Sequence, residues 1–419
     1  MRRGIAHASW ELAGSLRVLG GLCVLAASCP AVGVAAPASS APPDAYIDRD
    51  TGHRVIRLSR REGDNGCFYF HQNPFTARGD KMAFTGSTRN GWRAFTVDLE
   101  TLEVRQITEC ACGHPVVAPK RRELFYMKGD VVRATHLDTR KTRDIATVPA
   151  HYKYGRGLSV NADETLLAGC YAKGESEYRR VPKREFIQTL FKAGLPNALY
   201  TIDIKTGRIN EFYKRNVWFG HVQFSPTDPT RLSFCHEGPE RKLDRIWLAR
   251  VDGTGIRKIR ERTVKGEFVT HEFWNPDGKH IWFDLQFPRQ TGGGAFRGVA
   301  AWARGPHFYL ARNNIETGQE ARYGLPERAC SWHYNVSPDG KLLCGGGDGR
   351  DPFRGNVGKW IYLFKPQGKE MEVERLCNLA GHDYTFAPNV RFTPDGKWVV
   401  FQSKMHGRSQ VYAVEVQRR

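Results

Sequence analysis

Short runs of apolar residues alternate with polar turns along almost the whole chain. A turn rich in Pro, Asp and Gly, followed by a strand-like apolar run, occurs seven times. Proline presets the first dihedral of such a turn and glycine supplies its positive φ, so each copy predicts two strands joined by a tight turn. The copies are FTARGDKMAFTG from Phe75, VAPKRRELFYM from Val117, SVNADETLLAG from Ser159, FSPTDPTRLSF from Phe224, NPDGKHIWF from Asn275, VSPDGKLLCGG from Val336 and FTPDGKWVVF from Phe392.

A second module follows the first and consists of a strand, a turn resembling D/E-x-x-T-G, and another strand. Two hairpins per repeat make a four-stranded sheet, which is the blade of a β-propeller. Seven such repeats therefore predict an all-β, seven-bladed β-propeller. Copies of the second module start at Ala94, Val131, Ala198, Ile246 and Phe308, and the one at Val131 is degenerate.

The two ends of the chain carry complementary halves of the second module. DRDTGHRVIRL from Asp48 supplies the back half, and SQVYAVEV from Ser409 supplies the front half. We therefore expect the closing blade to be shared by N- and C-terminal strands, which leaves no long unpaired sheet edge. A sandwich or an open solenoid does not explain these halves.

Two stretches are longer than the repeat requires. Residues 178–195 predict a basic amphipathic helix with Phe186, Leu190 and Phe191 on one face, and residues 286–306 are rich in Gly and Arg. Both are expected as insertions on loops at a rim, where a rigid scaffold commonly carries binding residues.

The first residues are typical of a secretory signal peptide. Two arginines precede an apolar run from Leu16 to Ala36, and Ala36-Pro37-Ala38 matches an A-x-A cleavage pattern. We predict a signal peptide over 1–38, a linker over 39–46 and the propeller over 47–419, which implies a periplasmic or secreted protein. A membrane anchor and a lipid-modified Cys29 are the alternatives. No later segment approaches the roughly 20 apolar residues of a spanning helix.

The charge of the chain favours an acidic partner. The formal charge is +19, and removal of 1–38 takes away three arginines and one glutamate, which leaves +17. In an exported protein an acidic polysaccharide or an anionic envelope surface fits better than nucleic acid, although a solubility charge without a partner stays open. Eight cysteines follow the predicted signal peptide, and buried thiols are the simpler interpretation of those within apolar runs.

Histidines precede the turns of three successive repeats: His221 in FGHVQF, His271 in THEFWNPDG and His333 in CSWHYNVSPDG. Equivalent positions in neighbouring blades lie around one ring, so we expect these side chains to converge at the mouth of the central channel. The alternative is that each histidine packs or bonds locally. Two nearby segments, FCHEGP and LDRIW, add the candidates His236, Glu237 and Arg245.

These segments resemble the oligogalacturonide lyases, seven-bladed propellers that cleave short pectic oligomers by β-elimination. The similarity runs from about Phe219 to the C-terminus. It implies that His271 is the catalytic base, that Arg245 accompanies it, and that His333 is a manganese ligand. The resemblance also implies that the substrate-binding residues are His221, His236, Glu237 and Arg245.

The chain departs from this family at the other metal ligands. The family has a Q-x-x-H-x-H run directly before the last turn, where this chain has Tyr384, Ala387 and Asn389. Asn389 offers one oxygen, while His382 and Asp383 are out of register. A manganese cofactor is implied by the resemblance, but these substitutions predict weak or absent metal binding.

The residue types fit elimination from a uronate. A neutral histidine can remove the weakly acidic proton beside the carboxylate, and an arginine can grip that carboxylate with two parallel hydrogen bonds. We therefore predict a polysaccharide lyase acting on an acidic oligosaccharide, with oligogalacturonide favoured. The alternative is a non-catalytic envelope propeller that binds protein or acidic glycan. A peptidase-associated propeller is not supported, because the sequence has no G-x-S-x-G.

Overall fold

The computed structural model describes residues 42–152, 156–178, 180–239, 242–288, 308–347 and 359–418. They belong to one compact unit, Ala41–Arg419. The predicted signal peptide and nearly all of the insertion at 286–306 lie outside the described residues.

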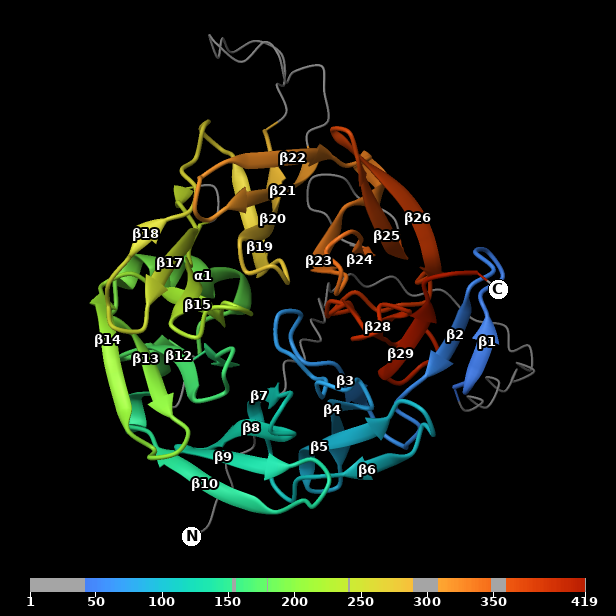
Figure 1. Cartoon of the computed structure of the whole chain (residues 1–419), viewed down its shortest axis with the longest axis horizontal. Coiled ribbons are helices and arrows are strands. Elements are labelled where there is room, and N and C mark those ends of the chain that lie inside the picture. The colour runs from blue at the N-terminus through green and yellow to red at the C-terminus, as the bar shows by residue number, and fades with distance from the viewer. Residues whose placement is uncertain are drawn as a thin grey trace, which may run out of the picture. The chain divides into compact units, whose positions relative to one another are not determined.

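The strands form seven antiparallel groups, which follow one another around a common centre within this unit (Figure 1). Neighbours along the chain pair within each group, as the two-hairpin repeat predicts. The groups are β3–β6 (Asn65–Gly66, Lys81–Thr88, Gly91–Asp98, Val104–Gln106), β7–β10 (Gly113–Ala118, Glu123–Lys128, Val131–His136, Thr142–Thr147), β11–β14 (Arg156–Val160, Leu166–Ala172, Asn197–Asp203, Ile209–Arg215), β15–β18 (Phe219–Phe224, Arg231–His236, Ile246–Arg250, Arg257–Lys258), β19–β22 (Phe268–Trp274, His280–Gln286, Phe308–Asn314, Glu320–Gly324), β23–β26 (Ser331–Val336, Leu343–Gly347, Trp360–Gln367, Glu370–Asn378), and β27–β29 (Arg391–Phe392, Trp398–Ser403, Gln410–Glu415) with β2 (Arg54–Arg57) and β1 (Ala45–Ile47).

The closing blade is built from both ends of the chain. β2 pairs with β29, with Val55 opposite Val414, and this confirms the predicted sharing. β1 adds a fifth strand, with Ala45 opposite Ile56, so part of the predicted linker belongs to the sheet. The two groups β19–β22 and β23–β26 are counted as one eight-stranded sheet through a single parallel pairing of β22 with β26.

The Pro-Asp-Gly turns lie between the first and second strands of their blades. Gly278, Gly340 and Gly396 have φ of 64°, 73° and 70°, in the left-handed region that favours glycine. A Cβ atom on Gly278 would lie 1.9 Å from the Thr227 hydroxyl in the turn of the neighbouring blade. The glycine is therefore needed for both the turn and the approach of the two blades.

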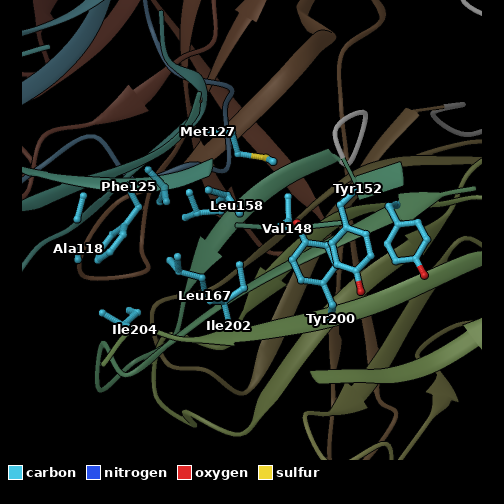
Figure 2. Packing of buried hydrophobic residues seen from close by; sticks show 14 of the residues in the cluster. Ala118, Phe125, Met127, Val148, Tyr152, Leu158, Leu167, Tyr200, Ile202 and Ile204 are labelled. Atoms are coloured by element: carbon cyan, nitrogen blue, oxygen red, sulfur yellow. The ribbon is translucent and has the colours of Figure 1, made fainter. Parts of the chain in front are cut away.

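Apolar side chains from neighbouring blades interlock between the sheets. Between β7–β10 and β11–β14, Phe125, Leu158 and Leu167 pack together, and the rings of Tyr152 and Tyr200 lie 4.6 Å apart (Figure 2). Burial of each large apolar side chain stabilises the fold by about 1.5–3 kcal/mol.

The helices are few and short. α1 (Lys183–Ala193) lies within the segment predicted to be helical, and it ends at Gly194, which has left-handed geometry. Leu190 of α1 is buried in a small cluster with Ala172 and Trp218, and Phe186 packs on its edge. The 3₁₀ turns are η1 (Ala150–Tyr152), η2 (Glu175–Tyr178) and η4 (Glu327–Ala329). None of the helices in the described residues has the length and apolar character of a membrane span. No disulfide joins the eight cysteines between Cys67 and Cys377, which all lie in described parts of the chain.

Candidate active site

The first strands of neighbouring blades are irregular at the predicted histidines. The pairing register shifts between Gly220 and Gln223 in β15 and between Thr270 and Phe273 in β19. His221 and His271 lie within these shifts and have φ of 46° and 53°. A bulge of this kind re-aims a side chain, at a local cost of about 1–3 kcal/mol for a non-glycine residue in this region.

The structure brings His333 of β23 to the same place. Its ring lies 5.0 Å from that of His271, edge to face, and the register of β23 also shifts between Ser331 and His333. Asn389, before β27, has φ of 50° and stands at the equivalent point of the last blade. Three predicted positions in three blades thus converge, because each lies four residues before the residue that opens its turn.

A segment of the first blade completes this cluster. The connection between β3 and β4 reaches toward the centre (Figure 1) and carries Tyr69, Phe70 and His71. Phe70 stacks on His333 at 4.4 Å, and the Tyr69 hydroxyl lies 3.4 Å from Nε2 of His221. This segment was not predicted from the sequence. Its signal was the run of aromatic residues and histidine just before the first turn, FYFHQNPF.

Arg245 lies between two carboxylates. Its Nε donates to Glu272 at 2.9 Å and its Nη1 to Glu237 at 3.1 Å, while the other Glu272 oxygen lies 2.9 Å from Nδ1 of His221. The side chains of Arg245 and Glu272 are 3% and 0% exposed, so each charge depends on the other for compensation. Burial alone would raise the pKa of Glu272, but Arg245 and His221 hold it well below its ordinary value. Two glutamates therefore balance the charge of Arg245.

His271 is paired with a buried acid that the sequence analysis did not identify. Its Nδ1 lies 3.1 Å from Oδ1 of Asp284, which comes from β20 directly opposite Thr270. Burial, followed by the positive charge of Arg245, lowers the pKa of His271 to about 3. Burial also raises the pKa of Asp284 well above its ordinary value. His271 is therefore uncharged near neutral pH, which is the state that a general base requires.

His236 lies outside this cluster. Its ring is stacked on Trp247 at 4.3 Å and on Phe219 at 5.6 Å. Neighbouring residues of a strand face opposite sides, so Cys235 points toward Glu237 while His236 points into the aromatic stack. Burial lowers the pKa of His236 to about 4.

The donors near His333 do not fit a four-ligand manganese site. Nδ1 of His333 and Oδ1 of Asn389 are buried without a hydrogen-bond partner of normal geometry in the described structure. The other candidates are committed elsewhere: the ring nitrogens of His382 lie 3.1 Å from the Ser403 hydroxyl and from the Phe386 carbonyl, and Asp383 accepts from the Thr385 amide. One imidazole nitrogen and one amide oxygen are fewer donors than manganese prefers.

A second group of possible ligands is unsuitable for a different reason. His221, Cys235 and Glu272 place ligand atoms within 4.8 Å of one another, the only such group among the described residues. The Arg245 guanidinium lies 3.3 Å from Nδ1 of His221 and bonds to Glu272, so a cation here would face a fixed positive charge. Burial also raises the pKa of the Cys235 thiol well above its ordinary range, and the thiol stays protonated.

Comparison with known proteins gives a consistent picture. A family model described as oligogalacturonate lyase matches residues 40–287. Two relatives, the oligogalacturonate lyase of Dickeya dadantii and the oligogalacturonide lyase of Pectobacterium atrosepticum, are each 28% identical over 88% of this chain and 95% of their own length. The solved oligogalacturonate lyase of Vibrio parahaemolyticus is 26% identical with a TM-score of 0.77, and covers 89% of this chain and 96% of its own. Another solved structure, an oligogalacturonate lyase in complex with manganese, is 28% identical with a TM-score of 0.74 and the same coverage. This chain belongs to the oligogalacturonate lyase family.

Proposed function

We propose that this protein cleaves oligogalacturonate, an acidic uronate-containing oligosaccharide, by β-elimination. The observation that carries the proposal is the neutral His271, held by Asp284 on the inner ring of the blades and adjacent to His333. Family membership supports the same reaction and the same substrate class.

His271 is the base in this proposal. With Asp284 accepting a hydrogen bond from Nδ1–H, the basic lone pair of the imidazole is on Nε2. Nε2 takes the proton from the carbon beside the uronate carboxylate. The electron pair of that C–H bond forms the new C=C bond, and the bond to the glycosidic oxygen on the next carbon breaks. The departing oxygen takes a proton from water and the imidazolium of His271 releases its proton to the solvent, so the products are a saturated and an unsaturated oligosaccharide.

Arg245 supports this step from within the protein. Its positive charge favours the neutral form of His271, and its bonds fix the carboxylates of Glu237 and Glu272. Through Glu272 it also orients His221, which we assign with Glu237 to the wall of the substrate site.

A related lyase has been solved in complex with manganese. A bound cation would stabilise the uronate carboxylate as it gains negative charge. In the described part of the ring, His333 and Asn389 present buried polar atoms that could hold such an ion, but one imidazole and one amide are fewer donors than manganese prefers. We therefore assign the reaction to the side chains of the protein.

We also infer that the protein acts after export, in the periplasm or outside the cell. The basic start, the apolar run and Ala36-Pro37-Ala38 support removal of 1–38. Mass spectrometry of protein from the envelope or the medium should find an N-terminus near Ser39. Recovery of intact Met1 from those fractions would contradict this inference.

The activity is tested by the ultraviolet absorbance of the unsaturated product. We expect product from oligogalacturonides and none from neutral oligosaccharides, and we expect His271→Ala to abolish it. His280→Ala is the matched control, because His280 lies in the same blade and also faces an aspartate, Asp277 at 2.7 Å, but at the exposed turn between β19 and β20. Binding of the oligosaccharide by wild-type protein without any product would favour the non-catalytic glycan-binding propeller instead.

A further inference from the structure

A buried arginine of the last blade lies next to the cluster of histidines. Arg391 of β27 is 5% exposed. Its Nη2 donates to the Tyr69 carbonyl at 2.7 Å and its Nη1 to the Gln72 carbonyl, so it holds both ends of the segment that carries Phe70 and His71. Phe70 in turn packs on His333. Arg391 is therefore connected to the site through the segment from the first blade.

The charge of Arg391 is not balanced by an acid in the parts of the chain that the structure describes. Its guanidinium donates to two neutral carbonyls, and none of the described carboxylates forms an ion pair with it. Burying a cation without a counter-charge is costly, because the protein interior solvates it less well than water does. An anionic group bound nearby would recover part of that cost.

Arg391 differs in this respect from Arg245. Glu237 and Glu272 already compensate the charge of Arg245, so that residue has no surplus charge for an anionic substrate. Arg391 holds the segment that carries Phe70 and His71, and Phe70 of that segment stacks on the ring of His333 at 4.4 Å. An anion bound near His333 would therefore be stabilised by the uncompensated charge of Arg391.

We propose that Arg391 supplies, in this chain, the fixed positive charge that stabilises the anionic uronate, and that elimination proceeds without a divalent metal ion. This inference rests on the proposed lyase activity. It agrees with the donor set, in which Ala387 has no ligand atom and His382 is bonded elsewhere. Arg391 acts at a distance and through the segment it holds, so it is a positioning and charge-supplying residue.

The first test uses the full-length protein and metals alone. Elemental analysis of the purified protein should find no stoichiometric manganese, and dialysis against a chelator should leave the rate of product formation unchanged within about twofold. Activity that is lost to the chelator and restored by manganese would overturn the inference while leaving the proposed function intact. Absence of product with and without manganese would instead overturn the proposed function.

The second test separates charge from hydrogen bonding at position 391. Arg391→Gln keeps amide donors for the carbonyls but removes the charge, whereas Arg391→Lys keeps the charge and loses the forked geometry. We expect Arg391→Gln to lower kcat/KM by about 100-fold, as loss of one stabilising group in an active site does. Arg391→Lys should retain kcat/KM within about tenfold of the wild type, and only Arg391→Gln should flatten the dependence of kcat/KM on salt. Equal losses in both variants, with equal salt dependence, would show that Arg391 is only a structural tie.

Discussion

The pairing of His271 with Asp284 gives a quantitative prediction for Asp284→Asn. The substitution is nearly isosteric, so the fold should tolerate it. An asparagine can donate to Nδ1 of His271, which favours the imidazole tautomer with its proton on Nε2, the wrong nitrogen for a base. A hydrogen bond contributes about 0.5–1.5 kcal/mol, which corresponds to roughly a 2- to 13-fold shift in the tautomer ratio. We expect kcat to fall by about that factor.

The assay is the initial rate of unsaturated product at saturating oligogalacturonide, with KM measured in parallel. KM should change little, because the Asp284 side chain is only 7% exposed and its carboxyl group is paired with Nδ1 of His271. Asp277→Asn is the matched control, since it removes the same group from the His280 pair at the exposed turn between β19 and β20. If Asp284→Asn keeps full kcat, or if Asp277→Asn loses as much, then Asp284 does not set the tautomer of the base.

Three other predictions concern different parts of the molecule. His236→Leu should leave kcat/KM within about twofold, because His236 lies in the aromatic stack. The pKa of His236 is about 4 in the folded chain and 6.5 in the unfolded chain, so the free energy of unfolding of the wild type falls as the pH drops through this window. In urea titrations the variant should therefore lose less stability than the wild type between pH 7 and 5. Tyr69 is 37% exposed beside the histidines, and Tyr69→Ala should raise KM about 2- to 13-fold by removing a ring face for the sugar, whereas Tyr69→Phe should not; an unchanged KM in the alanine variant would exclude this role. Oligogalacturonide turnover should slow with salt, since charges are screened over about 10 Å at 0.1 M, and equal turnover of a neutral glycan at high salt would contradict the preference for an acidic substrate.

The architecture could be predicted because the same local information occurs in every blade. Each turn carries its own Pro, Asp or Gly signal, and the half-modules at Asp48 and Ser409 have no other partner than each other. The histidines were found for the same reason, since a residue four positions before a repeated turn must lie on a repeated ring. His271 and His333 are in ring contact although 62 positions separate them in the numbering.

Residues without a place in the repeat were not found. Asp284 reaches His271 through the pairing of β20 with β19, and in the sequence it is one polar residue inside the apolar run IWFDLQF. In the sequence Arg391 is an ordinary basic residue between the apolar Val390 and Phe392. In the structure it is buried, and the carbonyls of Tyr69 and Gln72 accept its hydrogen bonds. The pairing of Arg245 could not be predicted either, because it depends on Glu237 and Glu272 from different strands folding onto it.

The bulge in β19 explains why the prediction of His271 as a site residue did not extend to its neighbour Glu272. In a regular strand His271 and Glu272 would face opposite sides of the sheet, so a pattern of period two assigns only one of them to the site. The left-handed residue at His271 breaks this alternation. It lets His271 meet Asp284 and His333, while Glu272 meets Arg245 and His221.

The strained backbone at His271 costs about 1–3 kcal/mol. It brings the proposed base and the neighbouring Glu272, which binds Arg245 and His221, to the same site. Gln223 from the preceding blade donates to the Glu272 carbonyl at 2.8 Å and holds this arrangement. The strain is therefore maintained by contact between blades, which is a property of the assembled ring and of no single repeat.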